Sequence, residues 1–188
     1  MVWTVPNTLT VLRIALIPVL VLVFYLPFPW SNLASTAIFG LAALTDWFDG
    51  YLARKLGQSS PFGAFLDPVA DKLIVAVALV MLVQANPRWW FVIPAAVIVG
   101  REIAISALRE WMAEIGERAQ VAVSVIGKIK TTAQMVALLL LLYREPLWAL
   151  PTRDIGIVLL YMAAILTLWS MVIYLRAAWP LLSGNDKS

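Results

Sequence analysis

Long runs without charge constrain this chain more than any other feature of its sequence. No charged side chain occurs between Ile14 and Thr45, and 62% of all residues are hydrophobic while only 13% are charged. A soluble domain carries about half apolar and roughly a quarter charged residues, whereas a helix that spans a membrane needs about 20 mostly apolar residues. The sequence therefore predicts an all-α membrane protein.

The apolar runs divide into segments of membrane-spanning length. Pro27, Pro29 and Asn32 interrupt the first uncharged stretch, and the run 86–88 (Asn-Pro-Arg) marks another tight connection. The predicted polytopic protein has six transmembrane helices, at residues 9–26, 33–56, 65–84, 89–112, 123–143 and 155–175. Since the spans and short connections account for nearly the whole sequence, residues 1–188 are predicted to form one membrane-embedded domain.

The placement of Lys and Arg predicts the orientation of these spans. If both termini are cytoplasmic, only Arg88, Arg144 and Arg153 of the fourteen basic residues lie on the outer side. Cytoplasmic loops of membrane proteins carry an excess of Lys and Arg. Both termini are therefore predicted to be cytoplasmic.

Missing residue types exclude several kinds of chemistry. The chain has no His and no Cys, so it cannot build a Ser-His-Asp triad, a cysteine nucleophile, a disulfide or a His/Cys zinc site. Its net charge of +3 is too slight to indicate a nucleic-acid partner. Acid–base chemistry must come from carboxylates, lysine, tyrosine or water, and any metal must be one that oxygen ligands bind.

Four aspartates lie where carboxylates are costly. Asp46 and Asp49 lie near the cytoplasmic end of the second predicted span, and Asp67 and Asp71 near the start of the third. Spacings of three and four residues place each pair on one helix face. Because the connection over 55–61 is short, the two helices should be antiparallel neighbours with the carboxylates facing one another.

Such a cluster needs compensating positive charge. Mg²⁺ or Mn²⁺ would supply it, and two ions held by shared carboxylates could clamp a phosphate or pyrophosphate. The alternative is that the aspartates form salt bridges with Arg54, Lys55, Lys72 or Arg101. Gly50 and Ala53, on the face of Asp46, could leave room for a bulky ligand or merely permit close helix packing.

A second, basic cluster comes from the fourth and fifth spans. It consists of Arg101, Arg109, Lys128 and Lys130, and Arg101 and Lys130 fall inside otherwise apolar segments, where they need an anionic partner. Positive-inside anchoring is the alternative explanation. Basic residues near an acidic metal cluster indicate two anionic ligands, one bridged by metal and one held by Arg and Lys.

The acidic segment resembles the signature of the CDP-alcohol phosphotransferase family. Its fixed positions are Asp46, Asp49, Gly50, Ala53, Arg54, Gly63, Asp67 and Asp71, with the spacing of the signature throughout. The runs 6–13, 101–113 and 127–132 extend the resemblance over nearly the whole chain. They are most similar to a bacterial branch of the family that uses glycerol 3-phosphate as acceptor.

The resemblance implies a CDP-alcohol phosphotransferase fold and a role for each motif residue. Two Mg²⁺ or Mn²⁺ ions would be held by Asp46, Asp49, Asp67 and Asp71, and Asp71 would also be the base that accepts the proton of the attacking hydroxyl. The residues implied to bind CDP-diacylglycerol are Asn7, Thr10, Gly50, Ala53, Arg54, Ser60 and Gly63. Those implied to bind the phosphate of glycerol 3-phosphate are Arg101, Arg109 and Lys130.

The implied activity is transfer of a phosphatidyl group from CDP-diacylglycerol to glycerol 3-phosphate, the committed step of phosphatidylglycerol and cardiolipin synthesis. The resemblance also implies a homodimer in the bacterial inner membrane with its active site facing the cytoplasm. Other acceptors remain open within the family: phosphatidylglycerol, inositol phosphate or serine. From a different class, a divalent-cation transporter would also have paired carboxylates within its spans, although here the acids stop at one side.

Overall fold

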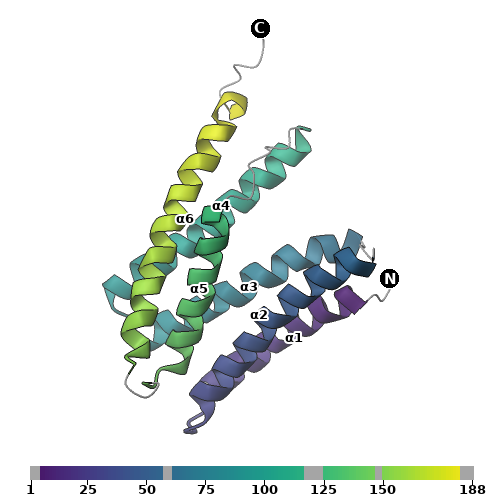
Figure 1. The fold of residues 1–188 in the computed structure, drawn as a ribbon. Coiled ribbons are helices and arrows are strands. Elements are labelled where there is room, and N and C mark those ends of the chain that lie inside the picture. The colour runs from purple at the N-terminus through teal and green to yellow at the C-terminus, as the bar shows by residue number, and fades with distance from the viewer. Residues whose placement is uncertain (1–4, 57–60, 117–124, 147–149, 183–188) are drawn as a thin grey trace. The chain divides into compact units, whose positions relative to one another are not determined.

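The structure is a computed structural model that describes residues 5–56, 61–116, 125–146 and 150–182. Within these ranges it leaves out the side chains of residues 5–6, 47, 49–56, 61–62, 64, 125–126, 128 and 180–182. The described residues form six α-helices: α1 (Val5–Phe24), α2 (Ser31–Leu56), α3 (Pro61–Ala85), α4 (Trp89–Glu114), α5 (Val125–Tyr143) and α6 (Thr152–Leu182) (Figure 1). They contain no β-strand, which confirms the predicted all-α class.

Each predicted span corresponds to one helix, but most helices extend past the predicted apolar segment at one end or both, while α1 ends at Phe24, before the predicted end at residue 26. α1 begins at Val5 and α6 continues to Leu182, whereas the predicted spans were 9–26 and 155–175. Apolarity marks the part of a helix that suits lipid, while the backbone hydrogen bonds of a helix continue into polar residues. The helix ends are therefore less visible in the sequence than the helix centres.

Among the described residues, three helical segments are long and apolar enough to cross a membrane: Asn7–Phe24, Trp89–Glu114 and Thr152–Trp179. Their outward faces carry large apolar side chains, and Leu22, Trp89 and Ile165 are each more than 60% exposed. Exposed apolar surface of this kind is typical of contact with lipid. The orientation, with both termini cytoplasmic, stays a prediction.

Side-chain hydroxyls close the short connections between neighbouring helices. The Ser31 hydroxyl donates to the carbonyl of Leu26 over 2.8 Å at the start of α2. The Thr152 hydroxyl donates to the carbonyl of Glu145 over 2.6 Å at the start of α6. These bonds satisfy backbone carbonyls that no helix pairs, which matters most where water is scarce.

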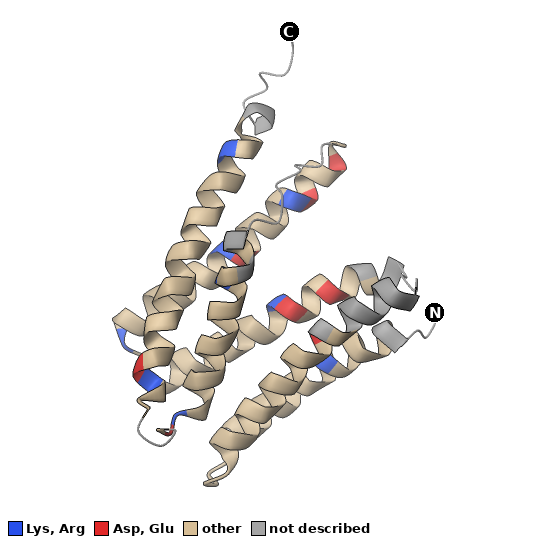
Figure 2. Cartoon of the chain, viewed as in Figure 1, with Lys and Arg blue, Asp and Glu red and all other residues tan. Residues whose placement is uncertain are grey.

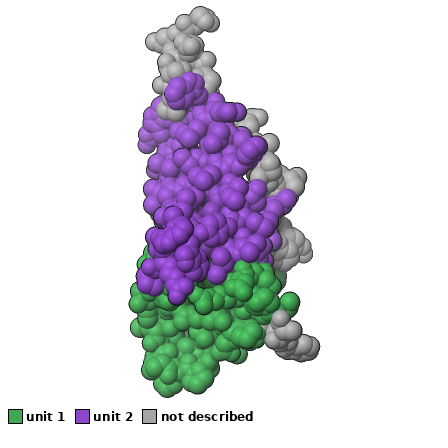
Figure 3. Space-filling view, turned by 90° about the vertical axis from the view of Figure 1, so that its left-hand side faces the viewer, with its two compact units in different colours: residues 1–86, 138–156 green, residues 87–137, 157–188 purple. Residues whose placement is uncertain are grey.

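Contacts within the chain divide it into two compact units. The first consists of residues 1–86 and 138–156, and the second of residues 87–137 and 157–188 (Figure 3). The prediction that residues 1–188 form one membrane-embedded domain stays a prediction.

In the first unit, α1 packs against both α2 and α3. Its buried apolar side chains include Ile17 and Leu20, and α2 contributes Phe39 and Ala42. Gly40 of α2 brings that helix close to α5, because a Cβ at this position would lie 3.5 Å from Leu139. Small residues at such points let helices approach closely where no water drives them together.

Charge is sparse along the helices and concentrated in short stretches (Figure 2). The core of the chain is largely apolar, yet Arg13 is among its largest fully buried side chains, at 1% exposure. Lys130 is also buried. A buried cation in an apolar helix is costly unless it is paired, so these two residues point to the sites described below.

Replacing Gly156 by Ala should destabilise the fold. A Cβ on Gly156 would lie 2.9 Å from Cγ of Leu141 and 3.3 Å from Cβ of Leu140, so α5 and α6 would have to move apart. We expect the free energy of unfolding to fall by about 1–3 kcal/mol, the usual cost of overpacking. Thermal unfolding in detergent, followed by circular dichroism at 222 nm, measures the change.

Gly100→Ala is the matched control, since among the described residues a Cβ on Gly100 meets no atom within 4 Å. Because Ala has the higher helix propensity, this variant should be neutral or up to about 1 kcal/mol more stable. Equal stability of the two variants would contradict the close α5–α6 contact.

Candidate active site

A polar stripe runs along the buried face of α1. Asn7, Thr10 and Arg13 follow one another at intervals of three residues and are at most 4% exposed. Side chains three residues apart lie on one face of a helix. Since α1 packs against α2 and α3, the stripe lies at the helices that carry the aspartates.

Arg13 joins carboxylates from two different helices. Its Nη1 atom lies 3.1 Å from Oδ1 of Asp46 on α2. The same atom donates a hydrogen bond to Oδ1 of Asp71 on α3. The guanidinium is buried, whereas the side chains of Asp46 and Asp71 are 39% and 40% exposed. Arg13 therefore contacts the two carboxylates from the buried side, and part of each carboxylate side chain stays accessible to solvent.

Thr10 makes the corresponding contact one turn earlier, since its hydroxyl donates to Oδ1 of Asp67 on α3. Asp67 and Asp71 are four residues apart on that helix, as predicted. Three of the four predicted acidic residues are thus gathered around one face of α1. The fourth, Asp49, lies in α2, and its side chain is outside the described residues.

The other predicted CDP-site residues are described only in part. Asn7, Thr10 and Gly63 are buried. Gly50, Ala53 and Arg54 lie on α2 without described side chains, and Ser60 lies outside the described residues. Their assignment to CDP-diacylglycerol stays a prediction.

The role of Arg13 is the main feature that sequence reasoning missed. The sequence pattern predicted that the aspartates face one another between the second and third spans. The cations predicted as their alternative partners lie on the second, third and fourth spans. In the structure, α1 is a third helix of the site, and its Arg13 contacts Asp46 and Asp71. The signal was present, because Asn7, Thr10 and Arg13 repeat every three residues and Arg13 stands within an apolar span.

The donor chemistry suits a hard divalent cation. Asp46 and Asp71 converge on one nitrogen atom of Arg13, so two carboxylates already share a single cationic group, and Mg²⁺ and Mn²⁺ prefer oxygen ligands. Among the described side chains, which exclude Asp49, no three acidic groups come close enough to hold a metal ion. The predicted binding of two Mg²⁺ or Mn²⁺ ions therefore stays a prediction.

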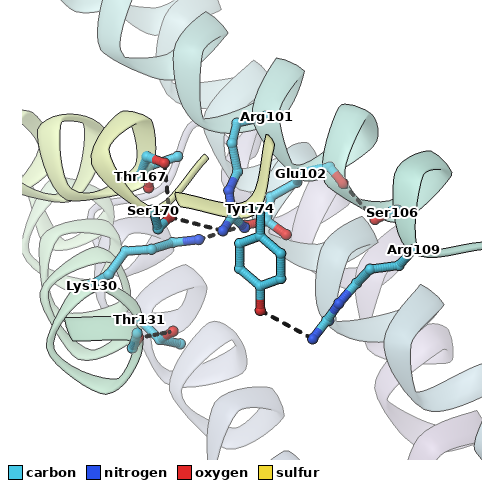
Figure 4. A network of polar contacts seen from close by, with 10 residues as sticks. Arg101, Glu102, Ser106, Arg109, Lys130, Thr131, Thr167, Ser170 and Tyr174 are labelled. Atoms are coloured by element: carbon cyan, nitrogen blue, oxygen red, sulfur yellow. Dashed lines mark hydrogen bonds and ion pairs between the residues drawn. The ribbon is translucent and has the colours of Figure 1, made fainter. Parts of the chain in front are cut away.

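The second unit contains the basic cluster, and Figure 4 shows how the side chains of Arg101, Arg109 and Lys130 meet; the side chain of Lys128 lies outside the described residues. Nη1 of Arg101 donates to Oε1 of Glu102 over 2.9 Å, and Nζ of Lys130 donates to the same oxygen over 2.8 Å. Nη2 of Arg101 donates to the Ser170 hydroxyl over 2.9 Å. Glu102 is thus the anionic partner that the sequence required for Arg101 and Lys130.

Tyr174 of α6 connects this cluster to Arg109. Nη2 of Arg109 lies 3.3 Å from the Tyr174 hydroxyl oxygen. The guanidinium carbons of Arg109 and Arg101 lie 5.4 Å and 5.9 Å from the centre of the tyrosine ring, within cation–π range. Sequence reasoning did not single out Ser170 or Tyr174, although a polar pair four residues apart on an apolar helix was a usable signal.

The three residues predicted to bind the acceptor phosphate therefore belong to one network. Arg101, Arg109 and Lys130 contribute three positive charges, and Glu102 contributes one negative charge. The remaining excess of positive charge suits an anion with several acceptor oxygens, such as a phosphate.

Comparison with known proteins identifies the family of the chain. The family model for CDP-alcohol phosphatidyltransferases matches residues 3–169. The chain belongs to this family. The match includes every residue of the acidic cluster and the predicted acceptor residues Arg101, Arg109 and Lys130.

Individual relatives cover almost the full length of the chain. A protein from Salmonella choleraesuis (strain SC-B67) is 58% identical over 178 residues, which is 95% of this chain and 96% of the relative. A protein from Escherichia coli (strain K12) has the same identity and coverage. Both are named CDP-diacylglycerol–glycerol-3-phosphate 3-phosphatidyltransferase.

In this CDP-alcohol phosphatidyltransferase, replacing Glu102 by Gln should destabilise the fold. The variant removes the charge that Arg101 and Lys130 share, and hydrogen bonds to charged groups contribute about 1.5–3 kcal/mol. We expect the free energy of unfolding to fall by about 1–3 kcal/mol, measured by thermal unfolding in detergent.

Glu110→Gln on the same helix removes an equal charge from an exposed position and should change stability by less than about 0.5 kcal/mol. If Glu102→Gln were as stable as this control, Glu102 would not pair the two cations.

Proposed function

We propose that this protein is a phosphatidylglycerophosphate synthase, which transfers the phosphatidyl group of CDP-diacylglycerol to glycerol 3-phosphate. The products are phosphatidylglycerol phosphate and CMP. The observation that carries this proposal is the 58% identity, over 95% of the chain, to relatives named for this reaction. The basic network of Arg101, Arg109 and Lys130 supports it, because the acceptor is itself a phosphate.

In the proposed site, Asp46, Asp49, Asp67 and Asp71 would hold two Mg²⁺ or Mn²⁺ ions. When bound, the ions supply the positive charge that polarises the pyrophosphate of the donor. The convergence of Asp46 and Asp71 on one atom of Arg13 supports this assignment, because it brings carboxylates of α2 and α3 to a common point.

The proposed chemistry is a direct displacement at phosphorus. Asp71 accepts the proton of the 1-hydroxyl of glycerol 3-phosphate, and the hydroxyl oxygen forms a bond to the β-phosphorus of CDP-diacylglycerol. The bond from this phosphorus to the bridging oxygen breaks, and CMP leaves with the electron pair. The partial exposure of Asp71 is compatible with access of the hydroxyl to its carboxylate.

The donor is assigned to the residues predicted for it: Asn7, Thr10, Gly50, Ala53, Arg54, Ser60 and Gly63. We also propose that the enzyme is a homodimer in the bacterial inner membrane. Its active site would face the cytoplasm, as the excess of Lys and Arg on that side indicates.

A product assay with purified protein tests the proposed reaction. With CDP-diacylglycerol and glycerol 3-phosphate in mixed micelles, we expect equal amounts of phosphatidylglycerol phosphate and CMP. Serine, inositol phosphate or phosphatidylglycerol in place of glycerol 3-phosphate should yield no more than a trace of lipid product. EDTA should stop the reaction, and Mg²⁺ or Mn²⁺ should restore it.

The outcomes separate the parts of the proposal. Absence of product with glycerol 3-phosphate, under conditions where another acceptor reacts, would replace the acceptor assignment. Full activity after exhaustive removal of metal would eliminate the metal site and leave the acceptor assignment intact.

Replacing Arg109 by Ala should weaken the acceptor site selectively. Arg109 is exposed and contacts Tyr174, so its loss should leave the fold intact. We expect the KM for glycerol 3-phosphate to rise about tenfold, equivalent to one charge-assisted hydrogen bond, while the KM for CDP-diacylglycerol stays within about twofold.

Arg176→Ala removes an exposed arginine of α6 and serves as the control, with both KM values unchanged. An equal rise of both KM values in the Arg109 variant would indicate a structural role instead.

A further inference from the structure

Arg13 combines two properties that are costly together. It carries a permanent positive charge, and its side chain is 1% exposed within a helix that has no other charged residue. Removing a guanidinium from water is compensated only by close anionic partners. The structure supplies two of them, Asp46 and Asp71, on the same Nη1 atom.

The aspartates have the complementary problem. Carboxylates of α2 and α3 brought to one point repel each other, and this repulsion opposes the packing of the two helices on α1. The positive charge of Arg13, on the buried side of these carboxylates, offsets their repulsion. Thr10 adds a hydroxyl donor to Asp67 from the same face of α1, but it carries no charge.

We propose that Arg13 is the built-in counter-ion of the acidic site, which holds Asp46 and Asp71 together when no metal is bound and thereby limits the affinity for divalent cations. This inference rests on the proposed metal site. It assigns to Arg13 a positioning role through the carboxylates rather than contact with a reacting atom.

The charges of these groups predict in which direction the affinity for a divalent cation changes when Arg13 is replaced. A divalent cation held by Asp46 and Asp71 would lie close to the guanidinium that contacts the same two carboxylates, and like charges at that separation repel. Removing the charge of Arg13 should therefore tighten metal binding. At the same time it should destabilise the metal-free protein, because Asp46 and Asp71 lose the guanidinium that both contact.

The experiment measures metal binding directly. Purified wild type, Arg13→Gln and Arg13→Lys are titrated with Mn²⁺ in detergent, and the free ion is quantified by electron paramagnetic resonance. We expect Arg13→Gln to bind Mn²⁺ about tenfold more tightly than the wild type. Arg13→Lys keeps the charge but loses the planar fork that serves two carboxylates, so its Kd should be about threefold lower than that of the wild type.

Thermal unfolding of the same proteins supplies an independent measurement. Without metal, the Tm of Arg13→Gln should lie below that of the wild type, and saturating Mg²⁺ should raise it by more than it raises the wild-type Tm. Arg176→Gln removes an exposed arginine and controls for net charge, with Kd and Tm unchanged.

The possible failures are distinguishable. If the wild type binds no Mn²⁺, the metal site itself is wrong, and the counter-ion role falls with it. If the wild type binds Mn²⁺ but the Arg13 variants bind it equally or more weakly, the metal site stands and the counter-ion role is wrong. Should Arg13→Gln fail to fold, the Kd of Arg13→Lys decides between these outcomes.

Discussion

The pairing of Arg13 with Asp46 and Asp71 is the interaction on which the first unit depends. It joins three helices at one atom, because α1 supplies the guanidinium and α2 and α3 supply the carboxylates. The buried guanidinium requires an anionic partner, since an unpaired buried charge costs far more than a paired one. The same requirement that favours packing of the helices also gathers the acidic residues that the proposed reaction needs.

In the basic network the charges are reversed, because one carboxylate pairs with two cations. Glu102 pairs with Arg101 and Lys130 through one carboxylate oxygen, so it compensates only part of their charge. Tyr174 adds a hydroxyl and an aromatic face to Arg109. Complete internal neutralisation would leave no attraction for a ligand, whereas an excess of positive charge retains affinity for a phosphate. Glu102 and Tyr174 thus stabilise the basic residues without neutralising them.

Much of the candidate site could be predicted because its residues are close in sequence. Helical periodicity places Asp67 and Asp71 on one face wherever the helix lies, and the high cost of charges in apolar spans made Asp46, Arg101 and Lys130 conspicuous. Partners from distant segments were less accessible. Arg13 is separated from Asp71 by 58 residues and Arg101 from Ser170 by 69, and no local pattern states which helices meet.

The sequence by itself determined that the chain is helical and apolar, which family it belongs to, and which charged residues need partners, since these properties depend on composition, local spacing and motif. Only the tertiary structure decided how those needs are met: Arg13 for the aspartates, Glu102 for Arg101 and Lys130, and Tyr174 for Arg109. The physical reason is that any opposite charge could satisfy a buried ion. The choice among candidates is made by helix packing, which brings particular faces within hydrogen-bond distance.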